Sequence, residues 1–249
     1  MHGETRRCGG ARRGPQGAAP TGLLTCGSAT VRQVEEIMTA AGPARVVLER
    51  PDRPGFLLVL THGAGGTPDT RDVLAVRDAG QALGAVTALV TQPYRVRGGR
   101  APGSADKQDS AWAELVGVLR RETAGDAPLP LVQCGRSNGA RVACRTARDV
   151  GAAGVIALAF PLHPPGQPEK SRDAELRGAG TSVLVINGAR DPFGVPERDE
   201  TTQVVILPEE THALSKRPAA IGDAVTAWLL SSMGTTLRSA SPGDYPQTP

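Results

Sequence analysis

A serine between two glycines follows an apolar run near the middle of the chain. The segment QCGRSNGAR, residues 133–141, places Ser137 between Gly135 and Gly139 at the spacing G-x-S-x-G. Where this motif joins a strand to a helix, a sharp turn exposes the serine hydroxyl beside the free N–H groups of the helix. The apolar run before Ser137 and the helical pattern after it predict such a turn. The alternative is a polar turn residue, because a chain with 31 glycines can contain this motif by chance.

A serine hydroxyl becomes a nucleophile when a base removes its proton, and the base needs a carboxylate that orients it. The chain offers Asp191 after the apolar run at 182–187, and His212 after the run at 203–207. Chemistry in a parallel sheet gathers at the carboxyl ends of the strands, so we expect both to lie near Ser137. Taken separately, Asp191 before a proline is also typical of a turn, and a lone histidine is often structural.

A glycine-rich loop, LTHGAGGTP at residues 60–68, follows another apolar run. We expect the backbone N–H of Ala64, together with that of Asn138, to bind an oxyanion, because donors fixed before the reaction stabilise developing negative charge. The loop does not fit a dinucleotide fingerprint, since Pro68 stands where the third glycine is needed. The sequence also contains no Walker-type phosphate loop.

Four further side chains are candidates for contact with a substrate: His62, Arg95, Arg136 and His163. Each lies in or next to a segment that follows a predicted strand. Arg95 belongs to an arginine-rich loop that is suited to an anionic group, and a solvated loop is the alternative. A hydrogen-bonded structural histidine is the alternative for His163.

Seven apolar, β-branched runs predict buried strands, at residues 45–50, 56–61, 85–91, 128–134, 154–160, 182–187 and 203–207. Helical patterns fall between them, at 76–83, 112–119, 140–150 and 218–234. This alternation predicts an α/β fold with a mostly parallel sheet and helices on both faces. The insertion at 161–180 is too short for a large cap domain, so we expect an open site.

The ordered motifs LTHGAGG, GRSNGAR, FPLHPPGQPEK, INGARDPFG and THALSK resemble the α/β-hydrolase superfamily over residues 45–233. More narrowly, they resemble its small dienelactone-hydrolase-like members, the group of the testis-expressed hydrolase-like protein and the NSL-complex subunit relatives. The resemblance implies an α/β-hydrolase fold with Ser137 as nucleophile, Asp191 as acid and His212 as base, and it assigns no substrate. Asn138 departs from the pattern, because many relatives carry Met or a similar apolar residue there, and we expect a changed pocket floor.

The leading hypothesis is a serine hydrolase that cleaves a small ester, thioester or related acyl substrate. This chemistry needs no cofactor and no metal. Two alternatives stay open. One is an interaction protein that has the same fold and a vestigial site, and the other is an acyltransferase that uses the same residues.

Length and composition bound the organisation of the chain. A chain of 249 residues that is 39% apolar can bury one sizeable core, so we predict a single domain at 29–234. The composition of residues 1–28 and 235–249 predicts disordered tails. Met38 leaves a second possible start for the biological chain, and the oligomeric state stays open.

Charge and hydropathy exclude several classes of partner. The formal net charge of +3 is accounted for by the first twenty residues, so the remainder is nearly neutral and we expect no nucleic-acid partner. No stretch approaches the roughly 18 apolar residues of a membrane span. The four cysteines show no metal-ligand spacing. We therefore expect a cytoplasmic protein with a small-molecule acyl substrate and no membrane partner.

Overall fold

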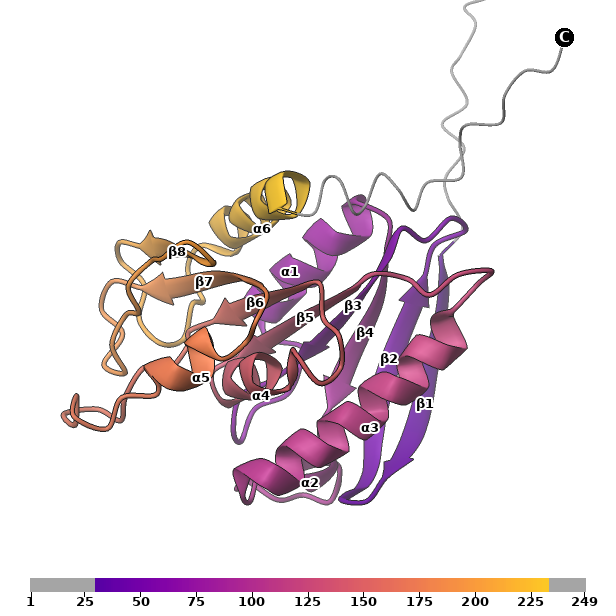
Figure 1. Cartoon of the computed structure of the whole chain (residues 1–249), viewed down its shortest axis with the longest axis horizontal. Helices are drawn as coiled ribbons and strands as arrows, with labels where there is room; N and C mark the ends of the chain where they lie inside the picture. Colours follow the sequence, from indigo (N-terminus) through magenta and orange to yellow (C-terminus); the bar gives the residue numbers. More distant parts are fainter. Residues whose placement is uncertain (1–29, 233–249) are drawn as a thin grey trace, which may run out of the picture.

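The computed structural model describes residues 30–232, and its centre is one twisted eight-stranded sheet (Figure 1). The strands lie in the order β1-β2-β4-β3-β5-β6-β7-β8. Six of them, β3 to β8, run parallel, while β2 pairs antiparallel with both β1 and β4. Their bounds are β1 Val31–Thr39, β2 Gly42–Arg50, β3 Phe56–Thr61, β4 Ala85–Thr91, β5 Leu131–Arg136, β6 Gly154–Leu158, β7 Ser182–Gly188 and β8 Thr202–Leu207.

The inner strands are apolar without alternation because both faces of the sheet are covered. Every residue of β3 and of β6 is buried. Continuous aliphatic runs of this kind are typical of parallel strands that lie between two layers of helices. All seven runs predicted from the sequence are confirmed as strands, and the mostly parallel α/β architecture is confirmed with them.

Helices cover both faces of the sheet (Figure 1). Helices α1 and α6 pack together on one face, around the buried Trp228 and Phe56. Helices α3, α4 and α5 cover the other face, with Trp112 and Leu115 buried beneath α3. The bounds are α1 Arg71–Ala82, α2 Pro93–Val96, α3 Ala105–Thr123, α4 Asn138–Thr146, α5 Asp173–Arg177 and α6 Pro218–Ser232. The four longer helices match the four predicted helical patterns.

An ion-pair network fixes α4 between its neighbours. The guanidinium of Arg145 on α4 makes two hydrogen bonds of 2.7 Å to Asp109 of α3, and a third of 3.1 Å to Glu175 of α5. Arg141, one helical turn earlier, donates to both carboxylate oxygens of Glu175 at 2.8 and 2.6 Å. Bidentate arginine–carboxylate pairs of this kind fix orientation as well as distance. The helix that begins at the G-x-S-x-G motif is therefore held from two sides.

The segment between β6 and β7 carries only the short helix α5, so the described part of the chain has no large cap domain, as predicted. The tails predicted at 1–28 and 235–249 lie outside the described residues, and so do the predicted domain limits. No helix within residues 30–232 is long and apolar enough to cross a membrane.

The edge strand β1 was not predicted from the sequence. Its apolar residues Val31, Val34 and Ile37 recur at intervals of three, which is not the alternation that marks a half-buried strand. Most of the strand is exposed. Only near its end are side chains buried, those of Ile37 and Thr39. Met38, the second possible start, lies inside this strand and pairs with Pro43 of β2.

We predict that a chain starting at Met38 is less stable than one starting at Thr30. The shorter chain loses nearly all of the ladder between β1 and β2, and it loses the burial of Ile37 against the core beneath α3. Burying one such side chain contributes about 1.5 to 3 kcal/mol, so we expect a loss of about 2 kcal/mol or more in the free energy of unfolding. Urea denaturation of both chains measures the difference, and equal midpoints and slopes would contradict a structural role for β1.

Candidate functional site

Ser137 lies in the sharp turn between β5 and α4 that its motif predicts. Its φ of 52° is in the left-handed region, which costs a residue with a side chain about 1 to 3 kcal/mol and is typical of functional turns. The two glycines of the motif make the turn possible. A Cβ on Gly135 would lie 2.1 Å from the carbonyl oxygen of Gly139, and one on Gly139 would lie 2.6 Å from the carbonyl oxygen of His62.

A continuous chain of hydrogen bonds joins Ser137, His212 and Asp191. The Oγ of Ser137 lies 2.8 Å from Nε2 of His212, and Nδ1 of His212 lies 2.9 Å from Oδ2 of Asp191. The Asp191 side chain is fully buried, while the His212 side chain is about one-fifth exposed. With Nδ1–H donating to the carboxylate, Nε2 is free to take a proton from the hydroxyl. The structure thus brings together the three residues that the sequence singled out from three separate strand ends.

The Asp191 carboxylate is held in place by two further donors. The backbone N–H of Phe193 donates to Oδ1 at 2.9 Å, and the side-chain amide of Asn187 lies 3.4 Å from Oδ2. Asn187 is itself fully buried and receives a 2.9 Å hydrogen bond from the N–H of Phe160. The ring of Phe193 lies against the ring of His212, with centroids 4.3 Å apart. Both partners of the acid–base pair are therefore fixed before any substrate arrives.

A buried carboxylate shapes the loop that carries His212. The side chain of Glu210 accepts three backbone hydrogen bonds, from the N–H groups of Ser215, Lys216 and Arg217 at 3.1, 2.6 and 2.7 Å. These N–H groups lie just before α6, so Glu210 connects the end of β8 to the start of that helix. The loop closes around His212 as a result.

Arg136 links the turn at Ser137 to the His212 loop. Its Nη2 donates to the carbonyl oxygen of His212 at 2.9 Å, and its Nε donates to the buried carboxylate of Asp72 at 3.2 Å. Asp72 lies in the first turn of α1. The sequence predicted substrate contact for Arg136. The structure gives its guanidinium a positioning role, and contact with a substrate stays a prediction.

The two backbone N–H groups predicted to bind an oxyanion are those of Ala64 and Asn138. Within residues 30–232, the N–H groups of Ala64 and Asn138 have no hydrogen-bond acceptor. Asn138 is the first residue of α4, where intrahelical acceptors are lacking. The loop that carries Ala64 lies close to Ser137, because a Cβ on Gly63 would approach the Ser137 Cβ to 3.1 Å. Both predicted amides are thus free of acceptors in segments that meet near Ser137, and their role toward an oxyanion stays a prediction.

His62 shapes this loop from beneath. Its side chain is fully buried, its Nε2 accepts the N–H of Gln92 at 3.0 Å, and its Nδ1 lies 2.8 Å from the carbonyl oxygen of Gly63. The acceptor at Nε2 places the proton of the neutral ring on Nδ1. Burial lowers the pKa of His62, which favours this neutral form. A buried ring with two backbone partners agrees with a structural role, and substrate contact by His62 stays a prediction.

The other two candidates also have protein partners. Arg95 donates to the carbonyl oxygens of Gly66 and Gly99 at 2.9 and 2.8 Å, so it connects the loop of Ala64 to the loop after α2. His163 is half-buried, and its Nδ1 lies 2.8 Å from the carbonyl oxygen of Pro164. This agrees with the structural alternative for His163. Substrate contact by either residue stays a prediction.

The two described cysteines, Cys134 and Cys144, are buried in the core, as expected of small apolar side chains. Burial raises the pKa of the Cys144 thiol to about 12 and raises that of Cys134 as well. Neither thiol is therefore poised as a nucleophile at neutral pH. Within the described part of the chain, no group of three or more His, Cys, Asp or Glu side chains is arranged to hold a metal ion.

Sequence reasoning missed the residues that hold the site together. Asn187 and Glu210 were not singled out, although they lie shortly before Asp191 and His212 in the sequence. The available signal was a polar residue at the end of a fully apolar strand for Asn187, and a carboxylate two residues before His212 for Glu210. Gln92 and Asp72 offer no comparable signal, since their partners come from distant segments.

We predict that Glu210→Gln lowers the free energy of unfolding by about 1 to 3 kcal/mol. The amide that replaces one carboxylate oxygen turns an acceptor into a donor that faces backbone N–H groups, so a buried donor loses its partner. Glu209→Gln is the matched control, because the Glu209 side chain is exposed. Urea denaturation compares the two variants, and equal effects would contradict the role given to Glu210.

We predict that His62 makes the protein less stable in acid. Its pKa is lowered in the folded state, so between that value and the ordinary pKa of about 6.5 the unfolded chain binds more protons. Stability then rises with pH through this window and is lost as the pH falls through it. His62→Asn removes this contribution. Unfolding free energies measured at about pH 7.5 and about pH 5.5 should differ more for the wild type than for the variant, and equal differences would contradict the assignment.

Comparisons with known proteins agree with this architecture. No curated protein sequence matches the chain. Among solved structures, XC6422 from Xanthomonas campestris, described as an α/β serine hydrolase without lid, is 18% identical with a TM-score of 0.62, over 86% of this chain and 97% of that one. Dienelactone hydrolase from Anabaena variabilis is 18% identical with a TM-score of 0.63, over 81% and 97%. Est1E from Butyrivibrio proteoclasticus is 16% identical with a TM-score of 0.60, over 81% and 99%.

At these identities the solved structures show a shared fold. The sequence profile of the family described as "Alpha/beta hydrolase domain" matches residues 54–217, which is more than half of the chain. The matched region begins just before β3 and ends just before α6, so it includes the Ser137 turn, Asp191 and His212. The chain therefore belongs to the α/β-hydrolase family.

Proposed function

We propose that this protein is a serine hydrolase that cleaves a small ester, thioester or related acyl substrate. The observation that carries the proposal is the hydrogen-bonded chain from Ser137 Oγ through His212 to the buried carboxylate of Asp191, at 2.8 and 2.9 Å. A partially exposed histidine between a hydroxyl and a buried carboxylate is the arrangement that activates a serine. The strained backbone at Ser137 supports the same reading.

The proposed reaction has two halves. In the first, Ser137 Oγ attacks the carbonyl carbon of the substrate while His212 Nε2 takes the hydroxyl proton, and the carbonyl oxygen becomes an oxyanion between the N–H groups of Ala64 and Asn138. The bond to the leaving group then breaks, and His212 passes its proton to that group. In the second half, His212 takes a proton from water, and the resulting attack releases the acid and restores the serine. Asp191 stabilises the protonated histidine throughout.

The sequence motifs also support a narrower kinship. We propose that the chain is one of the small dienelactone-hydrolase-like members, with the testis-expressed hydrolase-like protein and the NSL-complex subunit relatives in the same group. The shared motifs carry this proposal, and they leave the substrate open. A cytoplasmic location, and the absence of nucleic-acid and membrane partners, likewise stay predictions from composition and charge.

We predict that a fluorophosphonate probe labels the wild-type protein on Ser137. Ser137→Ala should not be labelled and should lose kcat/KM for short p-nitrophenyl esters by about 10⁴-fold or more, because the nucleophile acts as one unit with its base. Ser231→Ala is the control, since Ser231 is an exposed serine on α6 that donates to the Trp228 carbonyl oxygen. Intact mass measures the labelling, and a chromogenic assay measures the hydrolysis.

The outcomes separate the alternatives. A folded wild type that takes no label would overturn the proposal and favour an interaction protein with a vestigial site. Labelling that persists in Ser137→Ala would place the nucleophile elsewhere. If an added alcohol or amine receives the acyl group faster than water does, product analysis would assign an acyltransferase.

A further inference from the structure

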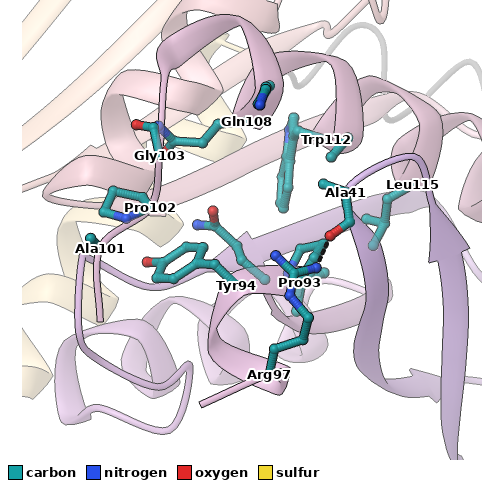
Figure 2. A pocket seen from close by; sticks show the side chains of 14 residues that line it. Ala41, Pro93, Tyr94, Arg97, Ala101, Pro102, Gly103, Gln108, Trp112 and Leu115 are labelled. Carbon is teal, nitrogen blue, oxygen red and sulfur yellow. Dashed lines mark hydrogen bonds between the residues drawn. The ribbon is translucent and has the colours of Figure 1, made fainter. Parts of the chain in front are cut away.

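A small cavity lies between α2 and α3. It is bounded by α2, by α3 and by the loop between them, and its volume is about 170 Å³. Figure 2 shows Trp112 of α3 projecting into it near Tyr94 and Pro93 of α2. Its apolar walls include Val90, Pro93, Tyr94, Ala111, Trp112 and Leu115.

The polar atoms of the two aromatic walls have partners in the protein. The indole N–H of Trp112 donates to the side chain of the buried Gln133, and the hydroxyl of Tyr94 lies 3.5 Å from the carbonyl oxygen of Gly63. Burial raises the pKa of Tyr94, so this hydroxyl stays protonated at neutral pH. The rings therefore offer apolar surface to whatever enters the cavity. On the far side, Arg97 donates to the carbonyl oxygen of Ala41 (Figure 2).

Gln108 stands between this cavity and the proposed active site. Its side chain lines the cavity, and its Oε1 accepts a 2.7 Å hydrogen bond from the side-chain amide of Asn138. The backbone N–H of that same Asn138 is one of the two proposed oxyanion donors. Neither Ser137 nor Asn138 is among the described residues that line the cavity. The side chain of Gln108 thus contacts both the cavity and the side chain of Asn138.

The order of the strands decides which half of a substrate would face the cavity. Ser137 follows β5, in the middle of the sheet, while His212 follows β8 at one edge. The leaving group must lie on the His212 side, because His212 gives it a proton. The cavity lies on the opposite side of Ser137, where β4 leads into α2. The acyl half of the substrate faces it.

We infer that this cavity binds the apolar end of the acyl group, a single aromatic ring or an aliphatic group of similar size, and that Gln108 controls entry to it. The inference rests on the proposed hydrolase function. An apolar cavity of about 150 Å³ binds a benzene ring, so a volume of about 170 Å³ suits one ring held against Trp112 and Tyr94, away from the polar lining at Arg97 and Lys107. Asn138 takes part through its hydrogen bond to Gln108, and a changed pocket floor at Asn138 stays an expectation.

The test compares two esters that share a leaving group. The ratio of kcat/KM for p-nitrophenyl phenylacetate to that for p-nitrophenyl acetate reports the contribution of the ring alone. Ala111→Leu puts a larger side chain into the cavity, and the ratio should fall by about tenfold. Ala113→Leu makes the same change on the same helix at a position that does not line the cavity, and the ratio should stay within about twofold of the wild type. Gln108→Ala removes the wall, and the ratio should rise by about threefold or more.

Each outcome either supports or overturns the inference. Equal ratios for wild type and a folded Ala111→Leu variant would overturn it, as would a fall of the same size in Ala113→Leu. If circular dichroism shows that Ala111→Leu does not fold, Gln108→Ala decides, and a ratio that does not rise overturns the inference. Wild-type protein that takes no fluorophosphonate overturns the hydrolase function as well, whereas labelled protein with unchanged ratios overturns the acyl cavity alone.

Discussion

The site depends on the close approach of three backbone segments at the turn after β5. Gly135 lies against the carbonyl of Gly139, and Gly139 lies against the carbonyl of His62, at distances that no side chain could tolerate. This contact brings the end of β3, the end of β5 and the start of α4 to one point. It also forces Ser137 into its left-handed conformation. The main chain thereby places the Cβ of Ser137 beside the loop that carries Ala64.

Buried polar groups extend this rigidity to the acid and the base. Asn187, near the end of β7, joins the loop of Asp191 to the segment after β6, and the Glu210 side chain accepts hydrogen bonds from three N–H groups of the loop that carries His212. Arg136 then connects that loop to the turn itself. A buried polar group without partners costs free energy, so each of these residues holds only one arrangement of its loop. The contacts of Asn187, Glu210 and Arg136 therefore hold Ser137, His212 and Asp191 in their relative positions.

The sequence predicted the alternating strands and helices, but not the side-chain contacts between them. Ser137, Asp191 and His212 could be found because each stands just past an aliphatic run, and parallel strands bring their ends to one edge. Asp72 could not be found as a partner of Arg136, because the two are 64 residues apart and only the packing of α1 beside β5 brings them together. The hydrogen bond from the N–H of Gln92 to His62 was missed for the same reason, since the two residues are 30 positions apart. β1 was not predicted because an exposed edge strand needs no alternation of apolar and polar residues.

The two sides of Ser137 are built in different ways, and this suggests how the protein divides chemistry from selectivity. On the His212 side, backbone N–H groups and buried carboxylates fix the loops. These loops therefore have little freedom to shift when a different molecule binds. On the opposite side, the boundary of the site is a side chain, Gln108, held by Asn138 and by the carbonyl oxygens of Gly103 and Ser104 at 3.2 and 3.1 Å. A side-chain wall can change by one substitution without moving the main chain. Under the proposed function, selectivity among acyl groups can therefore vary on this side while the arrangement of Ser137, His212 and Asp191 stays constant.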